Sequence, residues 1–245
     1  KDIPSQLMEY INNWKVVCPD WEIILWNEDS FDVNSHIFTQ TAYKHKKYAY
    51  VSDYVRAWAL YHFGGVYLDT DVEIKLPLDQ FLQYEAFSGF EKVGLPFTAV
   101  WGAIPKHSLS KMVLDYYNDR VYSVTEPPNT GFISKYIETN FFIDSSQDIN
   151  QVGSDGENTI NIFSSNYFCL DFPVNYTTHH FSGSWLDNKR NISYKDFLHG
   201  EYYLGKLDDL DVNSRIISLT KSISFKQLIL INIRYFYEFF RKCIE

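Results

Sequence analysis

The sequence predicts an α/β domain, and three features of the chain point to this class. Strand-like and helix-like stretches alternate through most of residues 1–220, and no internal repeat interrupts them. The chain has 245 residues, 45% of them hydrophobic, so it can bury a large core. Charged residues make up 22%, which excludes a wholly disordered chain. We expect one domain over 1–220 and a separate tail over 221–245.

The first elements are predicted from the spacing of apolar residues. Residues 5–17 place apolar side chains on one helical face, after a serine start and before a Cys-Pro stop. A short strand is expected at 22–26, and helical patterning resumes near His36. Residues 48–63 form the clearest helix, because Gly64-Gly65 ends it.

The remaining elements follow a short apolar strand at 66–69, which leads into Asp69-Thr70-Asp71. Later strands are expected at 86–90, 98–104 and 160–163, and later helices at 108–121 and 131–139. Residues 144–158 are rich in Ser, Asp, Gln, Gly and Asn, and this composition predicts a surface loop.

Charge and cysteine content exclude several classes of protein. Lys+Arg 22 against Asp+Glu 31 gives a net charge of -9, so there is no basic field to hold nucleic acid. The 3 cysteines are widely spaced and odd in number, which fits neither a disulfide framework nor a zinc site and favours a reducing cytoplasm. The longest clean apolar run, residues 228–231, is far too short to span a bilayer.

The candidate chemistry begins in the helix at 48–63. Asp53 and Arg56 are three residues apart and project from one helical stripe, so they can act as a pair. Taken alone, such a pair is more often an exposed ion pair on a helix surface.

Two further acids follow this helix. Asp69 and Asp71 stand at the carboxyl end of the strand at 66–69, and ligands of open α/β sheets bind outside the carboxyl ends of strands. If the strand ends or kinks there, both carboxylates can face one hard divalent cation, Mg²⁺ or Mn²⁺, whose shell a diphosphate would complete.

These residues carry a family resemblance. The runs 52–56, 60–61 and 64–71 resemble the signature of the DXD-containing family 32 glycosyltransferases, relatives of the initiating mannosyltransferases and of the glucosylating clostridial toxins. A weaker similarity extends upstream to 14–28 and downstream to 178–185, so that it covers residues 5–187. The resemblance implies a GT-A (Rossmann-like) nucleotide-sugar transferase domain with a mixed central sheet, here followed by an amphipathic C-terminal helix.

The resemblance also implies a role for each matching residue in the early motif. Asp53 and Arg56 would hold hydroxyls of the donor sugar, and Tyr67 would line the donor pocket. Asp69 would contact the ribose or the sugar beside the cation, and Asp71 would bind the metal directly.

In the late motif, His179 would complete the metal shell, and His180 is the competing candidate. Ser184 would lie near the diphosphate, and Trp185 would cap or hydrogen-bond the leaving group. A neutral imidazole is a better partner for Mn²⁺ than for Mg²⁺. The expected metal ligands are Asp69, Asp71 and His179.

The function that the resemblance implies is transfer of a hexosyl unit from a nucleoside-diphosphate sugar, with a UDP-sugar favoured, and with retention of configuration. The acceptor would be a hydroxyl of a glycan or lipid-linked saccharide in polysaccharide assembly, such as capsule, at the inner face of a bacterial membrane; a luminal eukaryotic setting is the alternative. Family members usually begin with an Ile-Pro-Lys-Ile-Ile-His strand and a Trp that supports the base. This chain begins after that point, so either it lacks the usual first strand or its base site is built differently.

Two other functions fit parts of the pattern. Residues 66–72 also match the strand and Asp-x-Asp start of haloacid-dehalogenase phosphatases, in which Asp69 would be the nucleophile and Asp71 the general acid. A carbohydrate-binding module would use the aromatic residues, 18% of the chain, to stack on sugars, and its acids to hold a structural Ca²⁺. Such modules tend to be all-β.

The tail differs in composition from the domain. Residues 224–243 are rich in aromatic and aliphatic side chains interrupted by lysine and arginine. Three explanations stay open: a helix docked on this domain or on a dimer partner, a helix lying in the plane of a membrane, and the end of a fragment.

Overall fold

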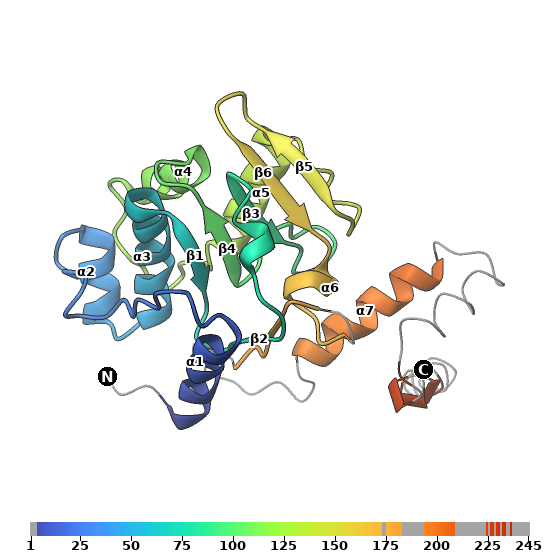
Figure 1. Ribbon diagram of the computed structural model, residues 1–245. Coiled ribbons are helices and arrows are strands. Elements are labelled where there is room, and N and C mark those ends of the chain that lie inside the picture. The colour runs from blue at the N-terminus through green and yellow to red at the C-terminus, as the bar shows by residue number, and fades with distance from the viewer. Residues whose placement is uncertain are drawn as a thin grey trace.

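The computed structural model describes residues 4–172, 175–182 and 194–208, and residues 224, 226–227, 229–230, 232–233 and 236. Its centre is a five-stranded sheet in the order β1-β4-β3-β6-β5, with helices packed around it (Figure 1). The strands are β1 Gly65–Leu68, β2 Val72–Ile74, β3 Ala86–Gly89, β4 Val100–Ala103, β5 Gln151–Ser154, β6 Thr159–Phe163 and β7 Thr177–His179. The helices are α1 Ser5–Val17, α2 Ile37–Lys44, α3 Tyr48–Phe63, the 3₁₀ turn η1 Asp79–Phe81, α4 Ser108–Tyr117, α5 Thr130–Asn140, α6 Ser165–Phe168 and α7 Tyr194–Asp208.

The central sheet is mixed. β3 and β6 run parallel, whereas β4 is antiparallel to both β1 and β3, and β5 is antiparallel to β6. A second, two-stranded sheet pairs β2 with β7 and lies near the end of β1 (Figure 1). The expectation of an α/β domain with a mixed central sheet is therefore confirmed.

The turn from α3 into β1 depends on glycine. Gly64 has a φ of +68°, and a Cβ built there would lie 2.7 Å from Cδ of Pro105. The Gly64 N–H still donates to the Leu60 carbonyl at 2.9 Å, so the helix closes before the chain reverses. Because α3 packs antiparallel to β1, the first turns of α3 lie at the carboxyl end of β1.

Helix α1 holds the short strand β2 in place. The Trp14 indole N–H donates to the Val72 carbonyl at 2.8 Å, and the Asn13 side-chain oxygen accepts from the Ile74 N–H at 3.2 Å. Both contacts use backbone groups of β2 that its one partner strand among the described residues does not satisfy. A strand of only three residues is thereby anchored to a helix.

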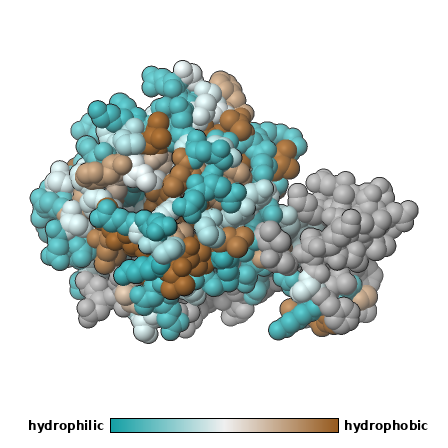
Figure 2. Space-filling model, viewed as in Figure 1, coloured by the Kyte–Doolittle hydropathy of each residue, from teal (hydrophilic) through white to brown (hydrophobic). Residues whose placement is uncertain are grey.

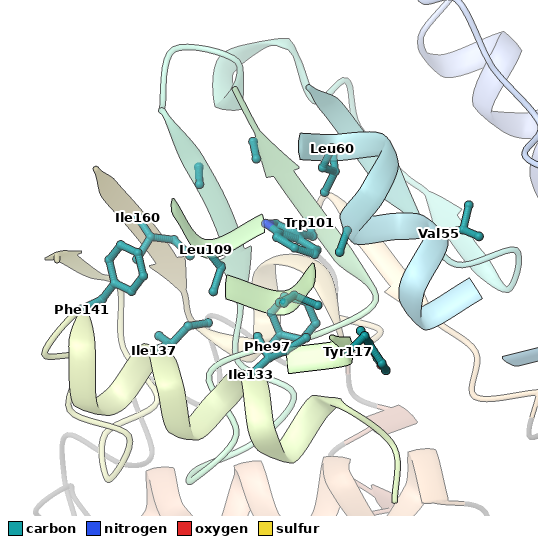
Figure 3. Close-up of a cluster of buried hydrophobic side chains, with 14 of the residues drawn as sticks. Val55, Leu60, Phe97, Trp101, Leu109, Tyr117, Ile133, Ile137, Phe141 and Ile160 are labelled. Carbon is teal, nitrogen blue, oxygen red and sulfur yellow. The ribbon is translucent and has the colours of Figure 1, made fainter. Parts of the chain in front are cut away.

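The core lies on both faces of the sheet. Val100 and Trp101 are consecutive residues of β4, and they belong to two different apolar clusters, as the alternation of side chains in a strand requires. Figure 3 shows Ile133 and Ile137 of α5 pointing toward the sheet beneath Trp101. Val55 and Leu60 bring α3 into the same cluster.

Two expected elements differ in kind from the structure, and the helix expected at 108–121 ends at Tyr117. Residues 22–26 form no regular secondary structure, because no strand of the described chain pairs with them, and Ile24 and Leu25 are exposed. The segment 144–158 is not only a loop, since β5 lies within it and pairs with β6 across a turn at Gly156, which has a φ of +92°. The Gly and Asp residues that predict a loop instead build this hairpin turn.

The surface of the domain and the tail bear on membrane contact. On the face in Figure 2, apolar side chains gather in several separate areas among hydrophilic ones. Among the described residues, no helix has both the length and the apolar character needed to cross a membrane. The tail at 221–245 lies largely outside the described residues, so its role stays a prediction.

Candidate functional site

Pairing of β2 with β7 brings the acidic motif to a histidine. Val72 stands opposite His179 in this ladder. As a result, carboxylate oxygens of Asp69 and Asp71 and a ring nitrogen of His179 all lie within 4.8 Å of one another. His179 Nε2 is 3.3 Å from Asp71 Oδ1 and 4.0 Å from Asp69 Oδ2.

The backbone between β1 and β2 lets both acids face the same point. Strand β1 ends at Leu68, and the Val72 N–H then donates to the Asp69 carbonyl at 3.0 Å, which closes a turn. In an uninterrupted strand, Asp69 and Asp71 would lie on the same face, but the extended backbone would hold their carboxylates apart. The turn brings the two carboxylates toward one point.

Asp71 is the most strongly held of the three. Its Oδ2 accepts the Ser182 N–H at 2.8 Å, and its carbonyl accepts the His180 N–H at 3.0 Å. Burial opposes the charge of Asp71, but hydrogen bonds and the proximity of His179 hold its pKa at about 2, so that the carboxylate is ionised. Burial likewise opposes the charge of His179, and Asp71 nevertheless raises the pKa of the imidazole.

The cluster has the chemistry of a cation site. Two carboxylates and one imidazole form a mixed oxygen and nitrogen set that suits Mn²⁺, and carboxylates alone suit Mg²⁺. The Asp71 and His179 side chains are only 15% and 11% exposed, so a cation held here would displace little water from them. These donors fit the divalent metal that the sequence predicts.

The His180 side chain contacts residues other than Asp69 and Asp71. Its Nε2 is 2.9 Å from Glu73 Oε2, and its ring stacks on Tyr10 of α1 with centroids 4.6 Å apart. Successive residues point to opposite sides of an extended chain, and His179 and His180 do so here. The structure thus places His179, and not its neighbour, beside Asp69 and Asp71.

The helix pair is buried. Arg56 Nη2 lies 2.6 Å from Asp53 Oδ1, and the Arg56 and Asp53 side chains are 6% and 15% exposed. Burial raises the pKa of Asp53 to about 6, although the Arg56 charge works in the opposite direction. The alternative of an exposed surface ion pair is therefore excluded.

Asn129 also contacts this pair, although no pattern in the sequence predicts its role. Its side-chain oxygen accepts a hydrogen bond from Arg56, and its amide group donates to the Tyr117 hydroxyl at 2.9 Å and to the Asp53 carbonyl at 3.4 Å. Asn129 is 2% exposed and lies just before α5. The helix expected at 131–139 puts Asn129 just before a helix, but it predicts no contact with a distant arginine.

Tyr67 joins the buried pair to the cluster. Its hydroxyl donates to Asp69 Oδ1 at 2.6 Å, and the Arg56 guanidinium carbon lies 5.7 Å from the centre of its ring. Burial raises the pKa of Tyr67 well above its ordinary value, so the phenol stays protonated and can keep donating. Asp53, Arg56 and Tyr67 are thereby connected to the cluster of Asp69, Asp71 and His179.

The surroundings of His179 include residues that the sequence does not predict, and two predicted residues cannot be placed. Ser184 and Trp185 lie outside the described residues. The structure adds Glu91, Phe181 and Tyr194 to the surroundings of His179. The Phe181 ring packs against both His179 and Tyr194, and the Tyr194 hydroxyl donates to Glu91 Oε1 at 2.6 Å.

Part of the chain that builds this site is similar to a known protein family. Residues 4–88 match the model of the glycosyltransferase sugar-binding region containing a DXD motif. The chain carries a DXD-containing glycosyltransferase region. This region includes α3, β1 and the acidic motif, and the resemblance expected from the sequence is confirmed there.

Curated relatives of this glycosyltransferase region come from two yeasts. Inositol phosphoceramide mannosyltransferase 1 of Schizosaccharomyces pombe is 29% identical over 119 residues, 44% of this chain and 36% of that protein. Inositol phosphoceramide mannosyltransferase 3 of the same yeast is 37% identical over 73 residues, 28% of this chain and 20% of that protein. Mannosyl phosphorylinositol ceramide synthase SUR1 of Saccharomyces cerevisiae is 28% identical over 111 residues, 44% of this chain and 29% of that protein.

The glycosyltransferase match weighs against the two other functions. The matches span at most about a third of each relative's own length, and no solved structure matches the chain at a significant level. The matched family nevertheless includes the Asp-x-Asp run that a phosphatase would need as its nucleophile motif. The helices around the sheet contradict the all-β architecture expected of a carbohydrate-binding module.

Proposed function

We propose that this chain transfers a hexosyl unit from a nucleoside-diphosphate sugar to an acceptor hydroxyl, in a GT-A-like domain that needs a divalent cation. The observation that carries this proposal is the closeness of Asp69, Asp71 and His179, whose ligand atoms lie within 4.8 Å of one another. They adjoin the buried Asp53–Arg56 pair through Tyr67. A site of this kind can hold a diphosphate and a sugar side by side.

The residues of the cluster would bind the donor's diphosphate end. Asp69, Asp71 and His179 would hold Mn²⁺ or Mg²⁺, which when bound supplies positive charge to the departing diphosphate. Tyr67 keeps Asp69 oriented through its 2.6 Å hydrogen bond. The Ser182 N–H does the same for Asp71.

The buried pair would bind the sugar end. Arg56 donates to Asp53 and Asn129, so its guanidinium is fixed before any ligand arrives. The Asp53 carboxylate can accept hydrogen bonds from sugar hydroxyls, and its charge opposes the positive charge that develops on the sugar ring. A preorganised pair of this kind needs no rearrangement during the reaction.

The reaction would retain the configuration of the sugar. The bond between the anomeric carbon and the phosphate oxygen breaks, a bond to the acceptor oxygen forms on the same face, and the acceptor proton passes to the leaving phosphate oxygen. This front-face course needs no protein nucleophile, and we assign none.

The donor and acceptor are proposed at the level of chemical class. The family resemblance favours a UDP-sugar, whereas the names of the yeast relatives point to mannosyl transfer and to an inositol phosphoceramide as acceptor. We propose a hydroxyl on a glycan or on a lipid-linked saccharide, a class that includes a sugar-bearing lipid headgroup. We also propose that the transfer takes place at the cytoplasmic face of a membrane.

A donor panel tests the proposal. Purified protein is incubated with UDP- and GDP-hexoses and Mn²⁺ without acceptor, and release of the free nucleotide is measured. We expect slow hydrolysis of one donor, which stops when a chelator removes the cation and is absent from the Asp71→Asn variant. Hydrolysis of a phosphomonoester in place of every nucleotide sugar would contradict the proposal and favour a phosphatase.

A further inference from the structure

His179 lacks the usual restraint of a histidine ligand. A metal-bound histidine normally donates its second ring N–H to a carboxylate or carbonyl, and this bond fixes the orientation of the ring. His179 directs Nε2 to Asp71, but its buried Nδ1 has no hydrogen-bond partner among the described residues. Within the described part of the chain, contacts other than a hydrogen bond to Nδ1 therefore orient the ring.

The Phe181 ring packs against the His179 ring. Their ring centroids are 3.8 Å apart. Phe181 has a φ of +51°, a conformation that is disfavoured for a bulky side chain. This backbone turn aims the Phe181 ring back at His179 and presents the Ser182 N–H to Asp71.

Tyr194 of α7 supports Phe181 from the other side. The Tyr194 ring meets Phe181 edge-on, with centroids 5.1 Å apart and an angle of 85°. The Tyr194 hydroxyl donates to Glu91 Oε1 at 2.6 Å, so it is tied to the segment that follows β3. Phe181 is thus enclosed between His179 and an anchored tyrosine.

Helix α7 is itself fixed to the domain. Leu198 is 1% exposed and packs in a cluster with Cys169 and Leu170. Lys92 lies 3.5 Å from Glu201 and 5.4 Å from the centre of the Phe197 ring. The position of Tyr194 is therefore set by the core and by contacts along the helix.

We propose that Phe181 and Tyr194 form an aromatic brace that positions His179 for the cation. The inference rests on the proposed function, because the brace acts on a residue of the proposed cation site. Phe181 and Tyr194 are positioning residues that act through His179. On this proposal α7, which lies outside the region matched by the family model, is part of the cation site.

The affinity of the intact chain for Mn²⁺, measured without any sugar donor, tests the brace. Phe181→Gly removes the ring while permitting the positive φ, and Tyr194→Phe removes only the hydroxyl that bonds Glu91. We expect Phe181→Gly to weaken Mn²⁺ binding about 10–100-fold, and Tyr194→Phe about 10-fold. Losses of this size follow when a residue that orients a metal ligand is removed. Phe181→Tyr, which keeps an aromatic ring, should restore the affinity.

A matched control lies on the same helix. Tyr203 also belongs to α7, and its buried hydroxyl has no hydrogen-bond partner among the described residues. Tyr203→Phe should therefore keep the wild-type affinity for Mn²⁺. In metal-free protein labelled with ¹⁵N-histidine, the ring signals of His179 should shift or broaden in Phe181→Gly and stay unchanged in Tyr203→Phe.

The outcomes separate the brace from the proposed function. If the wild type binds Mn²⁺ and loses it in Asp71→Asn, while Phe181→Gly and Tyr194→Phe both bind as tightly as the wild type, the brace is wrong and the cation site stands. If the wild type binds no Mn²⁺ in the presence or absence of a nucleoside diphosphate, both are wrong. If Tyr194→Phe does not fold, the test rests on the other two variants. The brace is then wrong if Phe181→Gly binds Mn²⁺ as tightly as Phe181→Tyr.

Discussion

Val72 stands opposite His179 in the ladder between β2 and β7, and this pairing places an imidazole beside the second aspartate of the Asp-x-Asp motif. Neither strand belongs to the central sheet. The central sheet orients β1, at whose end the Asp-x-Asp motif lies. The small second sheet brings this motif next to His179. Changes that loosen β2 or β7 should therefore affect the site before they affect the core.

The first prediction concerns Asp71. Asp71→Asn removes the charge that faces His179, and we expect Mn²⁺-dependent donor turnover to fall at least ~100-fold, because a cation would lose an anionic ligand. Circular dichroism should show a retained fold. Asp115→Asn, which alters an exposed carboxylate paired with Lys111, is the control and should keep full turnover. Near-normal turnover in Asp71→Asn would show that Asp71 is not a ligand.

The second prediction concerns the buried ion pair. Asp53→Asn leaves the Arg56 charge buried without its carboxylate, so unfolding should become easier by about 3–5 kcal/mol, and transfer should fall more than ~100-fold. Denaturant unfolding and donor turnover measure the two effects. Glu138→Gln breaks an exposed pair of the same i, i+3 spacing with Lys135 and should cost only about 0–1 kcal/mol. Equal costs in both variants would contradict the burial argument.

The third prediction concerns Asn129. Asn129→Ala removes the acceptor of the Arg56 hydrogen bond and the donor to Tyr117, and we expect a loss of about 1–3 kcal/mol in the free energy of unfolding. Donor turnover should fall as well, because Arg56 gains freedom. Asn118→Ala, at an exposed position after α4, serves as the comparison and should change neither quantity by much. If the Asn129→Ala protein has the stability and the turnover rate of the wild type, Asn129 has no role in the site.

The fourth prediction concerns the turn before β1. Gly64→Ala places a Cβ 2.7 Å from Cδ of Pro105 at a φ of +68°, and should lower the free energy of unfolding by about 1–3 kcal/mol. Gly131→Ala lies in α5, where a new Cβ meets nothing within 4 Å, and should stabilise the protein by about 0.5–1 kcal/mol. Urea unfolding of both variants measures the difference, and the prediction fails if the two changes have the same sign.

The fifth prediction concerns pH. His107 is 0% exposed; its Nδ1 accepts the Leu109 N–H at 3.1 Å, and its Nε2 lies 3.0 Å from the Thr159 carbonyl. This arrangement suits a neutral ring that donates from Nε2. Burial lowers the pKa of His107 from its ordinary value of 6.5.

The unfolded chain therefore takes up a proton at a higher pH than the folded chain does. The contribution of His107 to stability is fully present above pH 6.5 and is lost as the pH falls through the lower folded-state value. His107→Gln should remove this part of the pH dependence. The measurement is the difference between the urea unfolding free energies of wild type and variant, which should shrink as the pH falls below 6.5. A difference that does not change with pH would contradict the prediction.

Elements with local signals could be predicted from the sequence. Residues 48–63 and 5–17 form helices with the expected bounds, because apolar spacing and the residues at their ends act within a few positions. The strand after Gly64-Gly65 is also predictable, because its short apolar run directly follows the glycines that end the helix. The Asp-x-Asp motif could be placed at its carboxyl end without knowing any long-range contact.

Elements that depend on distant partners could not be predicted in this way. Strand β2 has three residues, one of them Glu73, and becomes a strand because β7 pairs with it and Trp14 binds its backbone. The roles of Asn129 and Tyr194 likewise depend on side chains far along the chain. The choice between His179 and His180 was open in the sequence, since only the register with β2 distinguishes the two positions.

The dependence of β2 on β7 also determines when the site can form during synthesis of the chain. All five strands of the central sheet have been synthesised once Phe163 has left the ribosome, but β7 begins only at Thr177. A chain that ends between these points contains the complete sheet and both aspartates, yet it has no imidazole at the cluster. During synthesis the cation site therefore forms after every strand of the central sheet is available, and divalent cations should not speed the formation of that sheet on the nascent chain.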